Sequence, residues 1–113
     1  MRAFENVGPI DRAAAEVEFA SGDSLRICKA LVSLAFHDPD WHWVQDICLR
    51  FLNDNNPEIG GVSATCLGHL ARIHGKLDRE RVVAALRNRL DDPEIGGRVE
   101  DALDDISESP RFS

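Results

Sequence analysis

The chain has 113 residues, of which 43% are hydrophobic and 29% charged, a composition typical of one globular domain rather than of a disordered or fibrous chain. Its formal net charge of −7 disfavours binding to nucleic-acid backbones and anionic membrane surfaces, which are themselves negative. No apolar stretch approaches the roughly 20 residues of a membrane-spanning helix, and Glu5 falls where a signal peptide has its apolar segment. We therefore expect one cytoplasmic domain over residues 1–113, with tails at about 1–10 and 108–113.

The charge is distributed unevenly along the chain. Residues 91–113 carry eight acids but only two basic residues, Arg98 and Arg111, whereas residues 1–90 carry 12 acids and 11 basic residues. The acidity therefore belongs to the last predicted helix. A negative field of this kind attracts basic partners.

Helix starts are easily recognised in this sequence, because Asp or Asn before Pro supplies an N-cap followed by a proline in the first helical position. This pattern occurs at Asp38, Asn56 and Asp92. Turn signals such as Gly22 and Gly75 end the intervening runs. No segment alternates as a strand does, so the expected elements are helices over 11–20, 24–37, 40–53, 57–74, 79–91 and 93–107.

The pentapeptide Pro-Glu-Ile-Gly-Gly occurs twice, at 57–61 and again thirty-six residues later at 93–97. A period of roughly 20 to 50 residues indicates stacked helical or strand units. The second helices of the three expected pairs align at this period, with the columns Leu31/Leu67/Leu103, Leu34/Leu70/Ile106 and Ala30/Cys66/Ala102. The first helices of the last two pairs align as Val44/Val82, Cys48/Leu86 and Leu52/Leu90. These columns predict three antiparallel helix pairs that bury their apolar faces against one another.

The helix expected over 57–74 carries Gly61, Ala64 and Gly68 on the side opposite its apolar stripe. Because glycine inside a helix costs about 1 kcal/mol relative to alanine, we expect these residues to allow close approach of another helix. The corresponding face of the last helix carries Asp101 and Asp104. It is expected to face water, either simply as the polar surface of a terminal repeat or as a docking surface for a basic partner.

The Asp-Pro-Glu helix start, the helix pairs and the run from Ala64 to Gly75 (ATCLGHLARIHG) resemble HEAT repeats. The resemblance covers about residues 24–107, and the first pair departs from it by lacking Asp-Pro. It implies an α-solenoid of the kind found in scaffolds and adaptors. In size, acidity and repeat type the chain also resembles small bacterial immunity proteins of contact-dependent or polymorphic toxin systems, which implies a cytoplasmic inhibitor that binds a toxin domain.

Catalysis and metal binding find little support in the sequence. Cys28, Cys48 and Cys66 are odd in number and lie on apolar stripes, which predicts buried, inert thiols in a reducing compartment. The segment 37–42 has the composition of a metal site, but its side chains diverge across a helix stop and a new helix start, and an aspartate is needed there as N-cap. A small metal enzyme therefore stays a minor alternative, and it would use His37, Asp38, Asp40 and His42. We expect no cofactor and no catalytic residue.

Trp41 and Trp43 are two residues apart, about 200° around a helix axis, so both cannot face the same core. Trp41 shares a face with Val44 and Cys48 and is the better core candidate. Trp43 then either packs on the preceding hairpin around Phe36 or is exposed as a binding anchor of the kind enriched in interface hot spots.

The second helices of such pairs line the concave face of a solenoid, which places further binding candidates on the helix over 57–74. The expected partner-binding residues are Thr65, His69, Arg72, Asp101, Asp104, Asp105, Glu108 and Trp43. The sequence therefore predicts a non-catalytic protein-binding module, in particular an immunity-type inhibitor that covers the basic cleft of a toxin domain such as a nuclease. The alternative is a scaffold or adaptor whose contacts centre on Trp43.

Overall fold

The computed structural model describes residues 8–109, which form six α-helices and no strand. Their bounds are α1 Arg12–Phe19, α2 Ser24–His37, α3 Trp41–Leu52, α4 Pro57–His74, α5 Arg79–Arg87 and α6 Gly96–Glu108. The all-α prediction is confirmed. Most of the two expected tails, residues 1–7 and 110–113, lies outside the described residues.

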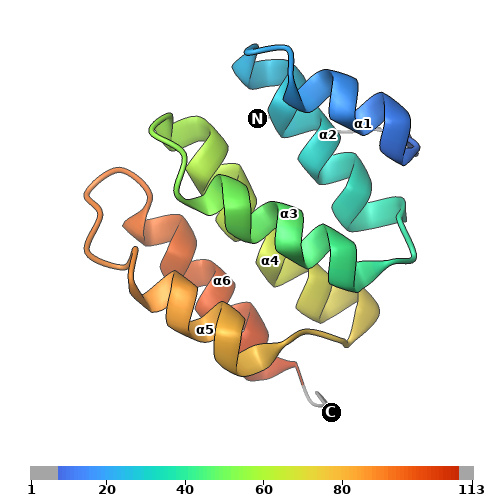
Figure 1. Ribbon diagram of the computed structural model, residues 1–113. Coiled ribbons are helices and arrows are strands. Elements are labelled where there is room, and N and C mark those ends of the chain that lie inside the picture. Colours follow the sequence, from blue (N-terminus) through green and yellow to red (C-terminus); the bar gives the residue numbers. More distant parts are fainter. Residues whose placement is uncertain (1–7, 110–113) are drawn as a thin grey trace.

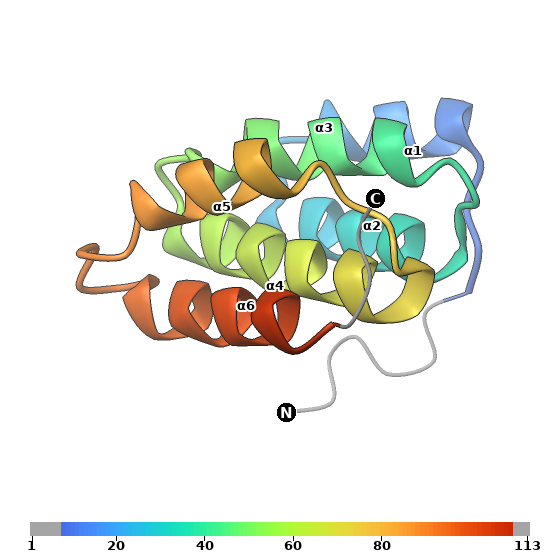
Figure 2. The ribbon, with the colours of Figure 1, turned by 90° about the horizontal axis from the view of Figure 1, so that it is seen from below.

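The helices form three antiparallel pairs that lie side by side, α1 with α2, α3 with α4 and α5 with α6 (Figure 1). Seen from below, α1, α3 and α5 form one layer, and α2, α4 and α6 form the other (Figure 2). The second layer is centred on α4, which packs against α2, α3 and α6. The residues of α4 are therefore enclosed on three sides, and the fourth side is the outer face of this layer.

The core runs through all three pairs and follows the repeated columns of the sequence. Leu31, Leu34, Leu67 and Leu70 have no exposed surface. Ile106 continues the column Leu34/Leu70 into α6 with 1% exposed, whereas Leu103, which continues Leu31/Leu67, is only partly buried. The columns Ala30/Cys66/Ala102, Val44/Val82 and Cys48/Leu86 are also buried. These residues come from every helix except α1. The expected packing of the second and third helix pairs on the first is therefore confirmed.

The repeated pentapeptide has a steric reason for its first glycine. A Cβ atom added at Gly60 would lie 3.2 Å from the carbonyl oxygen of Leu52, and one added at Gly96 only 2.6 Å from that of Leu90. In both copies the chain turns back so tightly that the new helix starts against the backbone just before it. The isoleucine that precedes each glycine, Ile59 or Ile95, is buried.

The third pair departs from the predicted boundaries at both ends of its connecting turn. Helix α5 ends at Arg87 rather than at residue 91, so Leu90 lies beyond the helix and is 39% exposed. The predicted column Leu52/Leu90 is wrong for this reason. Helix α6 begins at Gly96 rather than at residue 93, because the Asp92 carboxylate accepts hydrogen bonds from the backbone N–H groups of Glu94 and Ile95 and holds a turn there.

The small side chains of α4 do permit close packing against α6. A Cβ atom added at Gly68 would lie 3.3 Å from the Cα of Ala102 and 2.9 Å from a carboxylate oxygen of Asp105. At Gly61 the same atom would meet the guanidinium of Arg98 at 2.9 Å. This confirms that the small residues of α4 allow α6 to pack closely against it.

The start of α5 is tied to the second pair by a buried side chain. Gln45, on α3, has no exposed surface, and its Oε1 accepts a hydrogen bond from the backbone N–H of Asp78 at 2.6 Å. Asp78 is the residue immediately before α5. A helix start has backbone N–H groups that lack partners within the helix, so Gln45 supplies one of those partners from another repeat.

The two glycines of the second pentapeptide provide a matched stability test. Gly96→Ala forces a methyl group against the Leu90 carbonyl, and we expect it to lower the free energy of unfolding by about 1–3 kcal/mol. At Gly97 an added Cβ meets nothing within 4 Å, so Gly97→Ala should leave the stability unchanged or raise it by up to about 1 kcal/mol. Chemical denaturation of both variants measures the difference, and equal effects would contradict the steric explanation.

Candidate functional site

Five of the predicted binding residues meet where α4 and α6 lie side by side. Thr65, His69 and Arg72 come from successive turns of α4, and Asp105 and Glu108 come from the last turns of α6. We call these five residues the α4–α6 face. The face is formed because α6 packs on the glycine side of α4, which brings the Asp105 carboxylate to the edge of the central helix.

The polar end of the α4–α6 face is a shallow recess of about 320 Å³ lined by Arg72, Asp105, Glu108 and Ser109. The Arg72 guanidinium and the Asp105 carboxylate are 4.0 Å apart, at the outer limit of an ion pair. Both side chains keep much of their surface in contact with solvent. Arg72 is thus paired with an acid of the next helix, and at this exposure the pair contributes at most about 1 kcal/mol.

Thr65 has its hydrogen-bonding capacity used within the fold. Its hydroxyl donates to the carbonyl oxygen of Gly61 at 3.1 Å and accepts from the Nε of Arg98 at 3.2 Å. Arg98 thereby lies along α4 beside the glycines, so Thr65 helps to hold α6 in place. Any contact that Thr65 makes to a partner would come in addition to this structural role.

His69 occupies the middle of the face and links it to α2. Its ring centroid lies 4.8 Å from that of Phe36, the aromatic residue in the last turn of α2. Burial lowers the pKa of His69, and the neighbouring Arg72 guanidinium lowers it further, whereas the Asp105 carboxylate opposes the shift. The neutral imidazole is therefore the form that this environment favours.

Acidic residues of α6 extend from Glu108, in the α4–α6 face, around the outside of the helix. Asp101, Asp104 and Glu108 are exposed. Within residues 8–109 none of the three belongs to an ion pair. We call Asp101, Asp104, Asp105 and Glu108 the α6 acidic surface, and most of its charge is available to an external partner.

The opposite layer differs in having, among the described residues, two ion pairs that join neighbouring helix pairs. Arg12 of α1 donates to the Asp40 carboxylate in front of α3, and Arg81 of α5 lies 2.7 Å from the carboxylate of Asp46 on α3. The Arg12 guanidinium also lies over the ring of Trp43, 4.1 Å from its centroid. These contacts join α1, α3 and α5 and neutralise their charges locally.

The assignment of the two tryptophans differs from the prediction. Both rings are half-buried. Trp43 packs against the hydrophobic core with its outer side under Arg12, whereas Trp41 is in edge contact with the ring of His42. The core role assigned to Trp41 is therefore wrong. Trp43 belongs to the layer opposite the α4–α6 face, so the structure does not bring it together with the other predicted binding residues.

The segment proposed for metal binding is occupied by helix capping. The Asp40 carboxylate accepts from the backbone N–H of Trp43 and pairs with Arg12, two contacts that lower its pKa, with the Trp43 bond the larger cause. Asp38 accepts from the N–H of Asp40 at 2.8 Å, and His42 lies 3.9 Å from Asp46. Among residues 8–109, no three His, Cys, Asp or Glu side chains are grouped as metal ligands.

The cysteines have the environment of core residues. All three are buried, and burial is the main cause that raises the pKa of Cys28 to about 11. The pKa of Cys66 is also raised, chiefly by its hydrogen bond with Cys48 and by burial. A thiol with a raised pKa carries little thiolate at neutral pH and is a poor nucleophile, as the sequence indicated.

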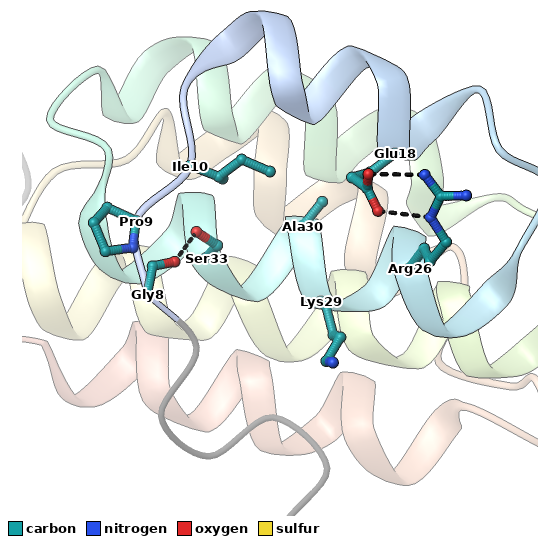
Figure 3. A pocket seen from close by; sticks show the side chains of 8 residues that line it. All are labelled: Gly8, Pro9, Ile10, Glu18, Arg26, Lys29, Ala30 and Ser33. Atoms are coloured by element: carbon teal, nitrogen blue, oxygen red, sulfur yellow. Dashed lines mark hydrogen bonds and ion pairs between the residues drawn. The ribbon is translucent and has the colours of Figure 1, made fainter.

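A second hollow, of about 270 Å³, lies between the segment 8–10 and α2 (Figure 3). Two pairs of its polar groups, Arg26 with Glu18 and Ser33 with Gly8, are bonded to each other. The Arg26 guanidinium holds the Glu18 carboxylate through two hydrogen bonds of 2.8 and 2.9 Å, and the Ser33 hydroxyl donates to the Gly8 carbonyl at 2.6 Å. Because these groups already have partners, the hollow is a weaker binding candidate than the α4–α6 face.

The fold and the site together define a small all-α protein with one layer of paired charges and one layer with an open acidic surface. No helix within residues 8–109 has the length and apolarity to cross a lipid bilayer. No protein-family model matches the sequence, and no curated protein matches it either, so the HEAT resemblance remains an interpretation of the repeats.

The fold has a counterpart of known structure. A chain in the crystal structure of a CDI complex from Cupriavidus taiwanensis LMG 19424 is similar to this protein, with a TM-score of 0.81 and 29% sequence identity. The alignment covers 91% of this chain and 93% of that chain. The similarity therefore extends over the whole three-pair architecture rather than over one helix pair.

Three residues of the α4–α6 region were not predicted as site residues. Phe36 and Ile73 are 45% and 44% exposed on its α2 side, and Arg98 lies across α4. Phe36 and Ile73 are apolar residues at the ends of apolar helices, which is the sequence pattern of core residues. The sequence therefore did not indicate that they are exposed. The single basic residue early in the last helix was the one available signal for Arg98.

The electrostatic balance at His69 can be tested by titration. Removing a positive neighbour favours the imidazolium, so Arg72→Gln should raise the pKa of His69, whereas Asp105→Asn should lower it further. Proton NMR of the imidazole against pH measures both shifts. Asp101→Asn serves as the control and should have a smaller effect than Asp105→Asn. Because the folded state favours neutral His69, its contribution to stability should be present above the ordinary pKa of about 6.5 and be lost as pH falls through the lowered value.

Proposed function

We propose that this protein is an immunity-type inhibitor that binds and neutralises a toxin domain. The observation that carries the proposal is its similarity, at 29% identity and over nine-tenths of both chains, to a chain of a CDI complex, where CDI stands for contact-dependent inhibition. Such a complex pairs a toxin with the protein that blocks it, so a related chain is expected to act through a protein partner.

The charge of the molecule supports the inhibitor rather than the toxin as its role. A toxin that cleaves nucleic acid needs a positive cleft for phosphates, whereas the open surface here carries Asp101, Asp104, Asp105 and Glu108. An acidic surface of this kind is complementary to such a cleft and competes with the nucleic acid for it. A basic toxin domain, in particular a nuclease, is therefore the partner that we propose.

A non-catalytic role agrees with the chemistry of the described residues. The thiols of Cys28 and Cys66 have raised pKa values, and the Asp38 and Asp40 carboxylates cap a helix start. The adaptor alternative depends on Trp43 as its anchor, but that ring lies beneath Arg12 and against the core. Asp101, Asp104 and Glu108, in contrast, are exposed.

Co-expression tests the proposal directly. Each open reading frame that flanks the gene for this chain is expressed in a test bacterium, alone and together with the chain. We expect one frame to stop growth alone and to be tolerated when this protein is present, because the inhibitor covers the toxin's active cleft. Colony counts give the protection, and copurification of the two proteins shows that it arises from binding.

The matched control for this experiment is an unfolded form of the chain. Leu67→Asp places a charge at a fully buried core position and should abolish both folding and protection. If the toxic frame kills equally well with the wild-type chain, or if no flanking frame is toxic, the immunity proposal is wrong.

The acidic surface should control the rate of association. Asp101→Lys with Asp104→Lys should slow association with the toxin domain by about tenfold or more at low salt, since steering by surface charge contributes 10-fold to 1,000-fold. The wild-type rate should fall as salt rises, because the Debye length shortens from about 30 Å at 0.01 M to about 8 Å at 0.15 M. Stopped-flow mixing over this range measures both effects.

A control for net charge is available on the other layer. Glu16→Lys with Glu80→Lys makes the same change in total charge on exposed positions of α1 and α5. This variant should slow association much less than the α6 variant. Equal effects of the two pairs, or a wild-type rate that is indifferent to salt, would remove the acidic surface from the docking mechanism.

A further inference from the structure

The α4–α6 face has an apolar border on its α2 side. Phe36 in the last turn of α2 and Ile73 in the last turn of α4 are 45% and 44% exposed. Ile73 lies one helical turn beyond His69, and the ring of His69 contacts that of Phe36 at 4.8 Å between centroids. We call Phe36 and Ile73 the apolar border.

The apolar border adjoins the polar recess. His69 contacts Phe36 on one side, and on the other it is close enough to Arg72 and Asp105 for both charges to influence its titration. The recess lined by Arg72, Asp105 and Glu108 therefore begins where the border ends. The Arg72–Asp105 contact of 4.0 Å is loose, so the carboxylate can accept a closer cation.

We propose that this combined surface receives an amphipathic basic segment of the protein partner, with an apolar side chain on Phe36 and Ile73 and an Arg or Lys side chain in the recess. The incoming cation displaces Arg72 and makes its ion pair with Asp105 and Glu108. This inference rests on the proposed function and specifies the part of the toxin domain that is recognised.

Charge decides between this occupant and a second copy of the chain. A two-fold dimer through the same surface would bring the α6 acids of both copies together, and each chain carries a formal net charge of −7. A basic segment meets the opposite sign. The tilted contact of Phe36 with the ring of His69 also orders the Phe36 ring before binding, which reduces the entropy lost when a partner packs on it.

The apolar half of the surface is tested by affinity measurements on the intact complex of this chain with the toxin domain. Phe36→Ala should weaken binding by about 30-fold or more, the effect of an aromatic hot spot, and Ile73→Ser should weaken it about tenfold. Leu25→Ser removes an exposed apolar side chain from α2 at a distance from α6, and this control should change affinity by less than about twofold. Thermal melts confirm that each variant is folded.

The polar half is tested by a double-mutant cycle. Asp105→Asn and a substitution of one basic toxin residue to Gln should each weaken binding, and the double variant should weaken it less than the product of the two single effects. Arg72→Gln should increase affinity, because it removes the competing cation. A strong loss on Arg72→Gln would overturn the displacement step.

Two outcomes separate this inference from the proposed function. If the wild-type chain neutralises the toxin but Phe36→Ala and Ile73→Ser bind as tightly as the wild type, the docking surface is wrong while the immunity function stands. If the wild-type chain forms a dimer in sedimentation experiments and Phe36→Ala dissociates it, the surface belongs to a second copy and the inference is overturned. Failure of the wild type to bind any toxin rejects the function itself.

Discussion

The close seating of α6 on α4 is the contact on which the rest of the structure depends. A single hydrogen atom in place of a side chain at Gly68 lets Ala102 and Asp105 approach the central helix, while the Arg98 guanidinium lies against Gly61. This approach carries the acids of α6 to the edge of α4 and places Asp105 beside Arg72. A bulkier central helix would hold α6 farther away, and the recess, the charge pair and the environment of His69 would all be lost. Packing of small residues thus determines the chemistry of the surface.

The two layers use charge in opposite ways. In the layer of α1, α3 and α5, Arg12 and Arg81 each reach an aspartate of the second pair, so the charges act between repeats and hold them in register. In the layer of α2, α4 and α6, most acids of the last helix remain without such partners within residues 8–109. The exposed acids of α6 therefore present a negative surface on this layer, and such a surface can orient a basic partner before contact.

The sequence predicted most of the fold because its signals were local. Proline after an N-cap located α4, and the thirty-six-residue period identified the buried columns. The same pattern at Asp38 was misleading, because Asp38 caps a turn and the N-cap of α3 is Asp40. The start of α6 was misplaced because Asp92 caps a turn with the same pattern that caps a helix at Asn56. Trp41 and Trp43 were exchanged because helical periodicity gives a relative angle but not which side another helix covers. The exposure of Phe36 depends on where α2 ends relative to α4, a tertiary property that no local pattern contains.

The hydrogen bond from Asp78 to Gln45 has a consequence for how such a stack can evolve. The repeated pentapeptide suggests units that could be duplicated or deleted freely, yet the first turn of the third unit relies on an amide supplied by the second. Excising the middle hairpin would join the outer two and remove the Gln45 amide, so the backbone N–H of Asp78 would lose its acceptor. The helix pairs resemble one another in sequence but cannot be interchanged. Adding or removing one would require a compensating substitution in the adjacent pair.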